Sequence, residues 1–352
     1  MTPVRECSPA PERVSIKDIA HAVGVSHSTV SRALNDSPLI NEKTRARIQA
    51  VATEMGYIPN AVARGLKAQR SSTVGLVVTS LTDPFFSEVM AGVDAVAGAA
   101  DLSMFVTASH NDPEREMAVI ETFHRRRVDG IIVAASRLSN RYRNRLARIQ
   151  VPIVLLNQHT DETQPDFHSV AFDEREGARL AVEHLLDLGH RRIGYLGLGN
   201  RQRSNRLRHE GYERALRDAG IVPAPDWAHV VPEHEIGTLD DAAVGERAFP
   251  ALLDSGVTAA LCYNDRTAAG ALVACRQQRV QVPVGISIVG FDDIELARWI
   301  SPPLTTVRQP REAMGRVAME MMLALLAGDA VEDRVLMPEL VRRESTGKRD
   351  RG

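Results

Sequence analysis

The pattern of apolar positions changes near residue 72. Before it, residues 16–23 and 48–55 each place apolar side chains at i, i+3, i+4 and i+7, which predicts short amphipathic helices. After it, short runs rich in Val and Ile alternate with helical stretches, which is typical of parallel sheets with helices on both faces. The chain is therefore expected to hold a small all-helical N-terminal domain and a larger α/β core.

Polar residues mark the ends of the predicted N-terminal helices. Ser15 and Ser26 can cap two short helices, and Gly24 supplies the turn between them. Asn41 can cap a third helix, which Gly56 would end. Two short helices joined by a glycine-containing turn form a helix-turn-helix unit, whose second helix enters the major groove of DNA.

The predicted second helix, HSTVSRAL, supports a DNA role. Val30 and Leu34 would face inward, which leaves outside the polar residues His27, Ser28, Ser31 and Arg32. Arginine can pair bidentately with guanine, and serine or histidine can donate or accept. A three-helix bundle without DNA function is the alternative, but packing explains such a polar second helix poorly.

The α/β part contains about a dozen elements, more than one compact sheet holds, and predicts two subdomains. Strand-like runs are TVGLVVTS, LSMFVTAS, GIIVAAS, VPIVLLN, SVAF, RIGYLGLG, AALCYN and ISIVGF. The first subdomain is expected to run to about residue 169 and the second to begin at about 170. Residues 304–310 are interpreted as a return crossing, after which helix 311–328 rejoins the first subdomain and residues 335–343 the second.

Charge is distributed unevenly along the chain. The 352 residues contain 43 Lys+Arg and 45 Asp+Glu, a net charge of −2. Residues 1–70 carry ten basic and six acidic residues (+4), so the rest carries 33 − 39 = −6. A basic N-terminal segment hints at a polyanionic partner. With no run of ~18 apolar residues, no signal-like N-terminus and only three cysteines, we expect a cytoplasmic protein without metal or cofactor.

Specific motifs then suggest a family. SIKDIAHAVGVSHSTVSRALND, followed by TRARIQAVATEMGYIPNAVARGLK, resembles the headpiece of the lactose-repressor family of bacterial transcription regulators. The resemblance extends over nearly the whole chain, except the first dozen and the last eight residues. It implies base-reading roles for His27, Ser28 and Arg32. Phosphate contacts are implied for Ser26, Thr29, Ser31 and Asn35.

The resemblance also implies a division of the chain. It gives a headpiece at 13–59, a hinge helix or linker at 60–70 and an effector-binding, periplasmic-binding-protein-like core at 71–345. The core would comprise an N-subdomain (about 71–169 and 306–330) and a C-subdomain (about 170–303 and 334–345). In the hinge, Leu66 would wedge between base pairs in the minor groove, with Ala63 and Arg64 lining that groove. A flexible linker is the alternative interpretation.

Candidate ligand contacts follow the predicted strands, because open α/β sheets bind ligands at the carboxyl ends of their strands. Polar or aromatic residues in these places are Phe86, Asn157, Gln158, Asp173, Ser204, Arg206, Arg208, Asn264 and Asp292. Ser204, Arg206 and Arg208 are expected on a loop. The resemblance implies effector contacts for Phe86, Ser204, Arg208, Asn264 and Asp292. The basic run 201–208 could favour an anionic effector or form a solvated face.

Together these features predict a DNA-binding transcription regulator, expected to be a repressor, controlled by a small molecule such as a sugar or sugar derivative. It would bind palindromic operator DNA as a homodimer through helix 87–98 and segment 305–326, in the bacterial cytoplasm at the nucleoid. Alternatives are a solute-binding receptor without a DNA role, or a regulator with a purine or phosphorylated corepressor. An enzyme is not expected: G-x-S-x-G, Walker A and H-E-x-x-H are absent, and GYLGLG lacks the last glycine of a dinucleotide loop.

Overall fold

The computed structural model describes residues 14–57, 70–134, 142–146, 148–157 and 167–349. The chain forms two compact units, residues 1–71 and 72–352, each of which is considered by itself. In the described ranges, no helix has the length and apolar character needed to cross a membrane.

The first unit, the headpiece, contains α1 (Ile16–Val23), α2 (His27–Leu34) and α3 (Glu42–Glu54). The predicted caps are confirmed: Ser15 and Asp18 form a capping box, the Ser26 hydroxyl accepts the Thr29 N–H, and Asn41 accepts the Thr44 N–H. Gly24 ends α1 at φ +75°, a left-handed conformation that suits glycine.

A small apolar core holds the three helices together. Ile19, Val30 and Ile48 are fully buried, one from each helix, while Val51 and Leu34 are half-buried at its edge. Burial of side chains of this size stabilises by roughly 1.5–3 kcal/mol each. The polar face of α2 is thereby fixed outward.

The second unit, the core, consists of two lobes. The first lobe holds β1 (Thr73–Val78), α5 (Pro84–Ala99), β2 (Ser103–Ala108), α6 (Pro113–Arg125), β3 (Gly130–Ala134), α7 (Arg143–Leu146), β4 (Ile153–Leu156), β5 (His168–Phe172), α14 (Arg311–Ala327) and β11 (Arg334–Leu336). Its sheet has the order β11-β5-β4-β3-β1-β2.

The second lobe repeats this plan. It holds α8 (Glu174–Asp187), β6 (Ile193–Leu198), α9 (Gln202–Asp218), a 3-10 turn (Pro225–Trp227), β7 (Ala228–Val231), α10 (Glu233–Ile236), α11 (Asp241–Asp254), β8 (Ala259–Cys262), α12 (Asp265–Gln277), β9 (Ser287–Asp292), α13 (Leu296–Trp299), β10 (Thr305–Arg308) and β12 (Glu339–Val341). Its sheet order is β12-β10-β9-β8-β6-β7, with β12 antiparallel.

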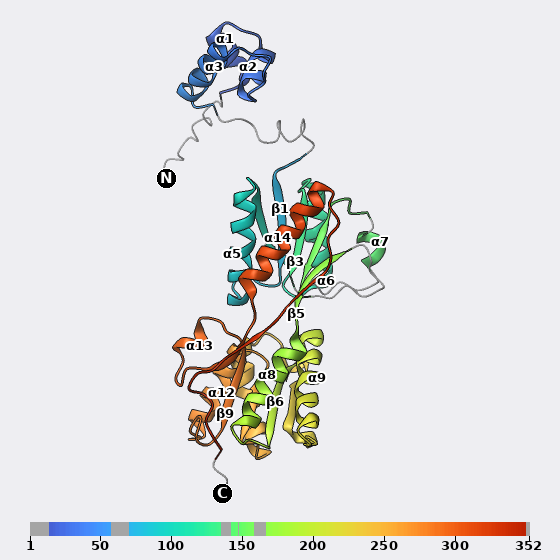
Figure 1. The fold of residues 1–352 in the computed structure, drawn as a ribbon, viewed down its shortest axis with the longest axis vertical. Coiled ribbons are helices and arrows are strands. Elements are labelled where there is room, and N and C mark those ends of the chain that lie inside the picture. Colours follow the sequence, from blue (N-terminus) through green and yellow to red (C-terminus); the bar gives the residue numbers. More distant parts are fainter. Residues whose placement is uncertain (1–13, 58–69, 135–141, 147, 158–166, 350–352) are drawn as a thin grey trace, which may run out of the picture. The chain divides into compact units, whose positions relative to one another are not determined.

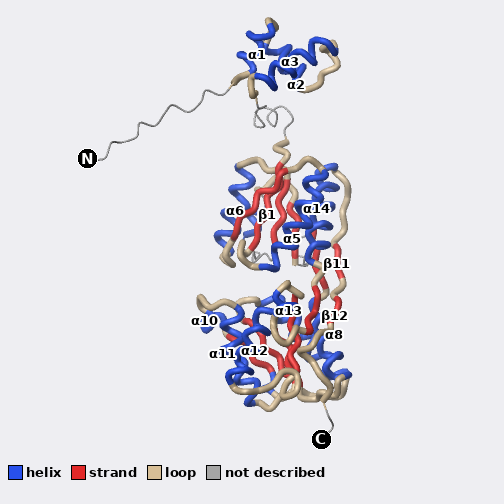
Figure 2. The backbone as a smooth tube through the Cα atoms, turned by 90° about the vertical axis from the view of Figure 1, so that its left-hand side faces the viewer, coloured by secondary structure: helices blue, strands red, loops and turns tan. Residues whose placement is uncertain are grey.

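Helices cover both faces of each sheet (Figures 1 and 2). In the first lobe, Leu76 and Val78 pack toward α5 and α14, whereas Val77 packs toward α6. Figure 1 shows α14 beside α5. A Cβ on Gly92 would lie 2.1 Å from the Glu312 carbonyl oxygen, so glycine is what lets these two helices approach so closely.

The predicted sheet membership was wrong at three places. Residues 170–172 belong to β5 in the first sheet, not to the second subdomain. Residues 306–308 belong to β10, which pairs with β9 in the second sheet, and 334–336 form β11, which pairs with β5 in the first. Strands buried on both faces have the same apolar pattern in either sheet. The chain crosses between lobes only after these strands end, beside Asp173, Gln309 and Met337.

Candidate effector cleft and DNA-binding surface

A cleft of about 450 Å³ lies at the carboxyl ends of strands from both lobes, within the size range of small-molecule sites. Three of its lining residues have a positive φ without being glycine: Asn111 at +60° lies in the turn after β2, Asn157 at +58° follows β4, and Asp292 at +110° ends β9. Such backbone geometry is uncommon and concentrates at functional sites. All three of these side chains line the cleft.

The first lobe supplies a largely neutral wall. Asp83 accepts the Phe85 N–H at the start of α5, and the rings of Phe85 and Phe86 meet edge to face with centroids 5.1 Å apart. Asn111 and Asn157 add side-chain amides. The Asn157 Oδ1 is buried without a hydrogen-bond partner among the described residues, so this acceptor is available to a ligand.

The second lobe supplies a charged wall centred on Arg208, which is 4% exposed. Its Nε donates to Glu174 Oε2 at 2.5 Å, and its Nη1 donates to the Tyr263 carbonyl oxygen. Its Nη2 lies 3.8 Å from Asp292 Oδ1. The guanidinium carbon lies 3.8 Å from the Phe291 ring centroid and 4.5 Å from that of Tyr263, so aromatic faces hold it as well.

Burial sets the protonation of the two carboxyl groups beside Arg208. It raises the pKa of Asp292 to about 7, against the opposing charge of Arg208. It also raises the pKa of Glu174, again opposed by Arg208. Gln309 donates to Asp292 Oδ1 at 2.5 Å. A ligand hydroxyl that donates to either carboxyl group would favour its charged form.

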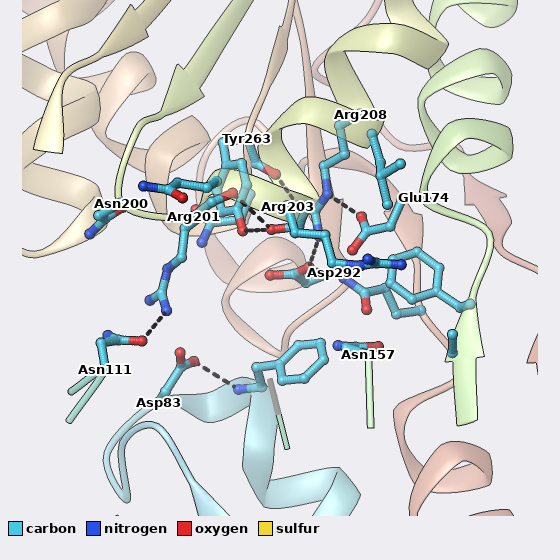
Figure 3. Close-up of a pocket in the computed structure, with 18 of the residues that line it drawn as sticks. Asp83, Asn111, Asn157, Glu174, Asn200, Arg201, Arg203, Arg208, Tyr263 and Asp292 are labelled. Atoms are coloured by element: carbon cyan, nitrogen blue, oxygen red, sulfur yellow. Dashed lines mark hydrogen bonds and ion pairs between the residues drawn. The ribbon is translucent and has the colours of Figure 1, made fainter. Parts of the chain in front are cut away.

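The lobes touch across the cleft. Arg201 Nη1 donates to Asn111 Oδ1 at 3.1 Å, a contact from the start of α9 to the turn after β2 that Figure 3 shows. Deeper in the second lobe, the hydroxyls of Ser204 and Tyr263 lie 2.7 Å apart. Each lobe therefore contributes polar groups to one shared cleft.

The cleft brings together six of the nine predicted contacts: Phe86, Asn157, Ser204, Arg208, Asn264 and Asp292. The side-chain amide of Asn264 already has partners within the protein, because its Oδ1 accepts from Thr267 and its Nδ2 donates to Asp241. Gln158 lies outside the described residues.

Asp173 and Arg206 are not among the lining residues. Asp173 Oδ1 accepts the Glu176 N–H and so caps α8. Arg206 pairs with Glu210 on the solvent side of α9. The expectation of a loop through 204–208 was wrong, since α9 already begins at Gln202. On a helix, 201, 204 and 208 share one face and 206 does not.

Sequence reasoning named six of the lining residues as contacts and missed the rest, among them Glu174, Tyr263 and Gln309. Glu174 and Tyr263 directly adjoin the predicted Asp173 and Asn264, so a rule that picks one residue after each strand passes over them. Gln309 follows β10, which was interpreted as a crossing segment instead of a strand.

The headpiece presents the predicted DNA-reading side chains. His27, Ser28 and Arg32 are exposed on α2, and Ser31 is half-buried. The Ser26 hydroxyl lies 2.8 Å from the hydroxyls of both Ser28 and Thr29, and Asn35 Nδ2 donates to the Ser31 carbonyl oxygen. Ala63, Arg64 and Leu66 of the predicted hinge lie outside the described residues.

A helix-turn-helix unit on a two-lobed α/β core with a ligand-sized cleft defines a class of protein, the effector-controlled DNA-binding regulator. Residues 15–60 match the family described as bacterial regulatory proteins, lacI family, and residues 182–346 match a periplasmic binding protein-like domain. The HTH-type transcriptional regulator GalS of Salmonella typhimurium is 38% identical over 344 residues, 96% of this chain and 97% of GalS.

Two further comparisons agree. The ribose operon repressor of Haemophilus influenzae is 36% identical over 338 residues, 94% of this chain and 98% of that protein. The crystal structure of the lac repressor dimer bound to operator and the anti-inducer ONPF has a TM-score of 0.85 at 30% identity, with 96% of this chain and 100% of that one covered. This chain belongs to the lacI family and is a DNA-binding transcription regulator.

Proposed function

We propose that this chain is a homodimeric repressor whose operator affinity is set by a neutral, polyhydroxylated small molecule, a sugar or sugar derivative, in the cleft. The observation that carries this proposal is the balance of charge in the cleft. Three arginines line it (Arg201, Arg203, Arg208), and so do three carboxyl groups (Asp83, Glu174, Asp292). A balanced set of donors and acceptors suits a ligand without net charge.

Hydroxyl groups satisfy such a site because each one both donates and accepts. A hydroxyl between Arg208 Nη2 and Asp292 could accept from the first and donate to the second, across the 3.8 Å that separates them. The rings of Phe85 and Phe172 provide apolar surface for the C–H faces of a sugar.

Control of DNA binding would work through the lobes. A ligand that contacts both lobes changes the free energy of the arrangement in which Arg201 contacts Asn111. The segments that cross between the lobes transmit this change to the first lobe. A ligand shifts the equilibrium only by its differential affinity for the two states. The coupling is reciprocal: DNA changes ligand affinity by the factor by which ligand changes DNA affinity.

We infer a dimer because one headpiece reads one half-site and a palindromic operator needs two. The predicted segment 87–98 lies on α5, whose apolar side packs on the sheet while Glu88, Ala91 and Asp94 remain exposed. This exposed side is available to a second copy. A cytoplasmic location follows from the need to reach operator DNA.

A purine is the second candidate ligand. Four aromatic rings line the cleft (Phe85, Phe86, Phe172, Tyr263), and a planar base could stack on one of them. A receptor without a DNA role does not fit a chain whose residues 15–60 match the lacI family.

The test is a thermal-shift screen over sugars, sugar acids, nucleosides and phosphates. A ligand that binds the folded protein raises the unfolding midpoint by mass action. Each hit is then added to an operator titration at fixed salt. We expect a neutral sugar to raise the midpoint and to change operator affinity; hits confined to nucleosides would favour the purine candidate instead.

A further inference from the structure

Glu174 occupies a special place in the cleft. It is the first residue of α8, directly after the chain crosses between lobes, and it is 7% exposed. Figure 3 shows its carboxylate turned toward Arg208. Its Oε2 accepts from Arg208 Nε at 2.5 Å. A buried carboxylate therefore already occupies the arginine that would otherwise be the natural anion receptor of this site.

The donors of Arg208 decide what else can bind there. A carboxylate or phosphate grips a guanidinium best through two adjacent N–H groups along one edge. Glu174 takes Nε on one edge, and the Tyr263 carbonyl oxygen takes a donor of Nη1 on the other. The rings of Phe291 and Tyr263 lie against the guanidinium. Two of the three guanidinium nitrogens of Arg208 are therefore already engaged by the protein, and an incoming anion has to compete with these partners.

The surroundings of the remaining nitrogen, Nη2, also disfavour an anion. Asp292 Oδ1 lies 3.8 Å from it, and Glu174 pairs with Nε of the same guanidinium. An anionic oxygen would accept from Nη2 but has no proton to give to these carboxylates. Arg203 also acts on Glu174 electrostatically, so the Glu174 carboxylate offsets positive charge from two of the three lining arginines, Arg203 and Arg208.

We infer that Glu174 is a specificity-determining residue that excludes anionic effectors, such as uronic acids and sugar phosphates, and selects neutral polyols. The inference rests on the proposed effector function of the cleft and adds to it the residue that sets the ligand's charge. Removing the charge of Glu174 while keeping its shape makes the lining more positive by one unit charge. The cleft then becomes a receptor for a monoanion.

The test compares matched ligands on two variants. Glu174→Gln keeps an oxygen that can accept from Arg208 Nε, so Arg208 stays in place. Glu176→Gln is the control: it removes one negative charge from the same helical turn, but Glu176 pairs with Arg179 and does not line the cleft. The probes are D-galactose against D-galacturonate, D-glucose against D-glucuronate and glucose 6-phosphate, and D-ribose against ribose 5-phosphate.

Binding is measured by calorimetry and thermal shift, each variant against its own unliganded midpoint. We expect Glu174→Gln to bind at least one anionic probe roughly 10- to 100-fold more tightly than wild type does. Glu176→Gln should behave as wild type. No gain for any anionic probe in Glu174→Gln, an equal gain in Glu176→Gln, or a wild-type preference for the anions would each overturn the inference. The wild-type response to neutral probes is scored separately and decides the proposed ligand class.

Discussion

The two lobes share one strand order but build different walls. The strands follow one another in the same relative order in the two sheets, β11-β5-β4-β3-β1-β2 and β12-β10-β9-β8-β6-β7. The first lobe lines the cleft with rings and amides around one carboxylate, Asp83. The second lines it with the buried charges of Arg208, Glu174 and Asp292. In the proposed function, the second lobe would fix the polar groups of the ligand with its charged side chains, and the first lobe would provide the apolar surface and amides.

The largest expected effect comes from removing the centre of the charged wall. Arg208→Met leaves Glu174 and Asp292 buried without their cation, which typically costs about 3–5 kcal/mol of stability. Ligand binding should disappear. Denaturant unfolding and calorimetry measure the two effects. Arg206→Met, two residues away on the solvent side of α9, serves as control and should lie within about 0.5 kcal/mol of wild type.

In the neutral wall, substitutions of two neighbouring rings should have different effects, one on stability and the other on ligand binding. Phe86 is 4% exposed and packs in the core, so Phe86→Ala should cost about 3–5 kcal/mol of stability. Phe85 is only half-buried and lines the cleft, so Phe85→Ala should weaken ligand binding about tenfold with a much smaller loss of stability. Urea unfolding with matched calorimetry distinguishes them, and equal losses of stability would refute this assignment.

Breaking the contact between the two walls should change the effect of the ligand on operator affinity more than it changes ligand affinity itself. Arg201→Ala removes the hydrogen bond to Asn111. One such bond contributes about 0.5–1.5 kcal/mol, so the ratio of operator affinities with and without ligand should change by roughly two- to tenfold. Fluorescence anisotropy on labelled operator measures this ratio. An unchanged ratio would mean that this contact does not distinguish the two states.

A pH dependence is also expected from Asp292. Its pKa of about 7 in the folded protein lies above the ordinary value of 3.8. Between about pH 4 and 7 the unfolded chain loses this proton while the folded one keeps it. The free energy of unfolding of the unliganded protein should therefore fall over that range and level off above it.

Ligand binding should show the opposite trend at the same group. A hydroxyl that donates to Asp292 favours the charged carboxylate, so affinity should rise with pH through about 7, up to about tenfold for each unit by which the ligand lowers this pKa. Calorimetry at pH 6, 7 and 8 measures the rise. Asp292→Asn should reduce the rise of ligand affinity with pH. Any rise that is left would come from Glu174, since burial raises the pKa of that carboxyl group too.

Much of this organisation could be predicted from the sequence, because it depends on local rules. Helix caps at Ser15, Ser26 and Asn41 and the apolar runs of the strands follow from neighbouring residues alone. What could not be predicted depends on orientation. A position after a strand does not tell whether a side chain turns into the cleft, as in Glu174, or back onto its own helix, as in Asp173. Sheet membership of β5, β10 and β11 likewise depends on long-range pairing.

The measurement that tests the central claim most directly is a closed thermodynamic cycle on the wild-type protein. Operator affinity is determined without and with a saturating neutral sugar from the screen, and sugar affinity is determined without and with operator. We predict that the two ratios differ from one and equal each other, and that Arg208→Met brings the operator ratio to one. A sugar that binds the cleft and leaves operator affinity unchanged would contradict the account.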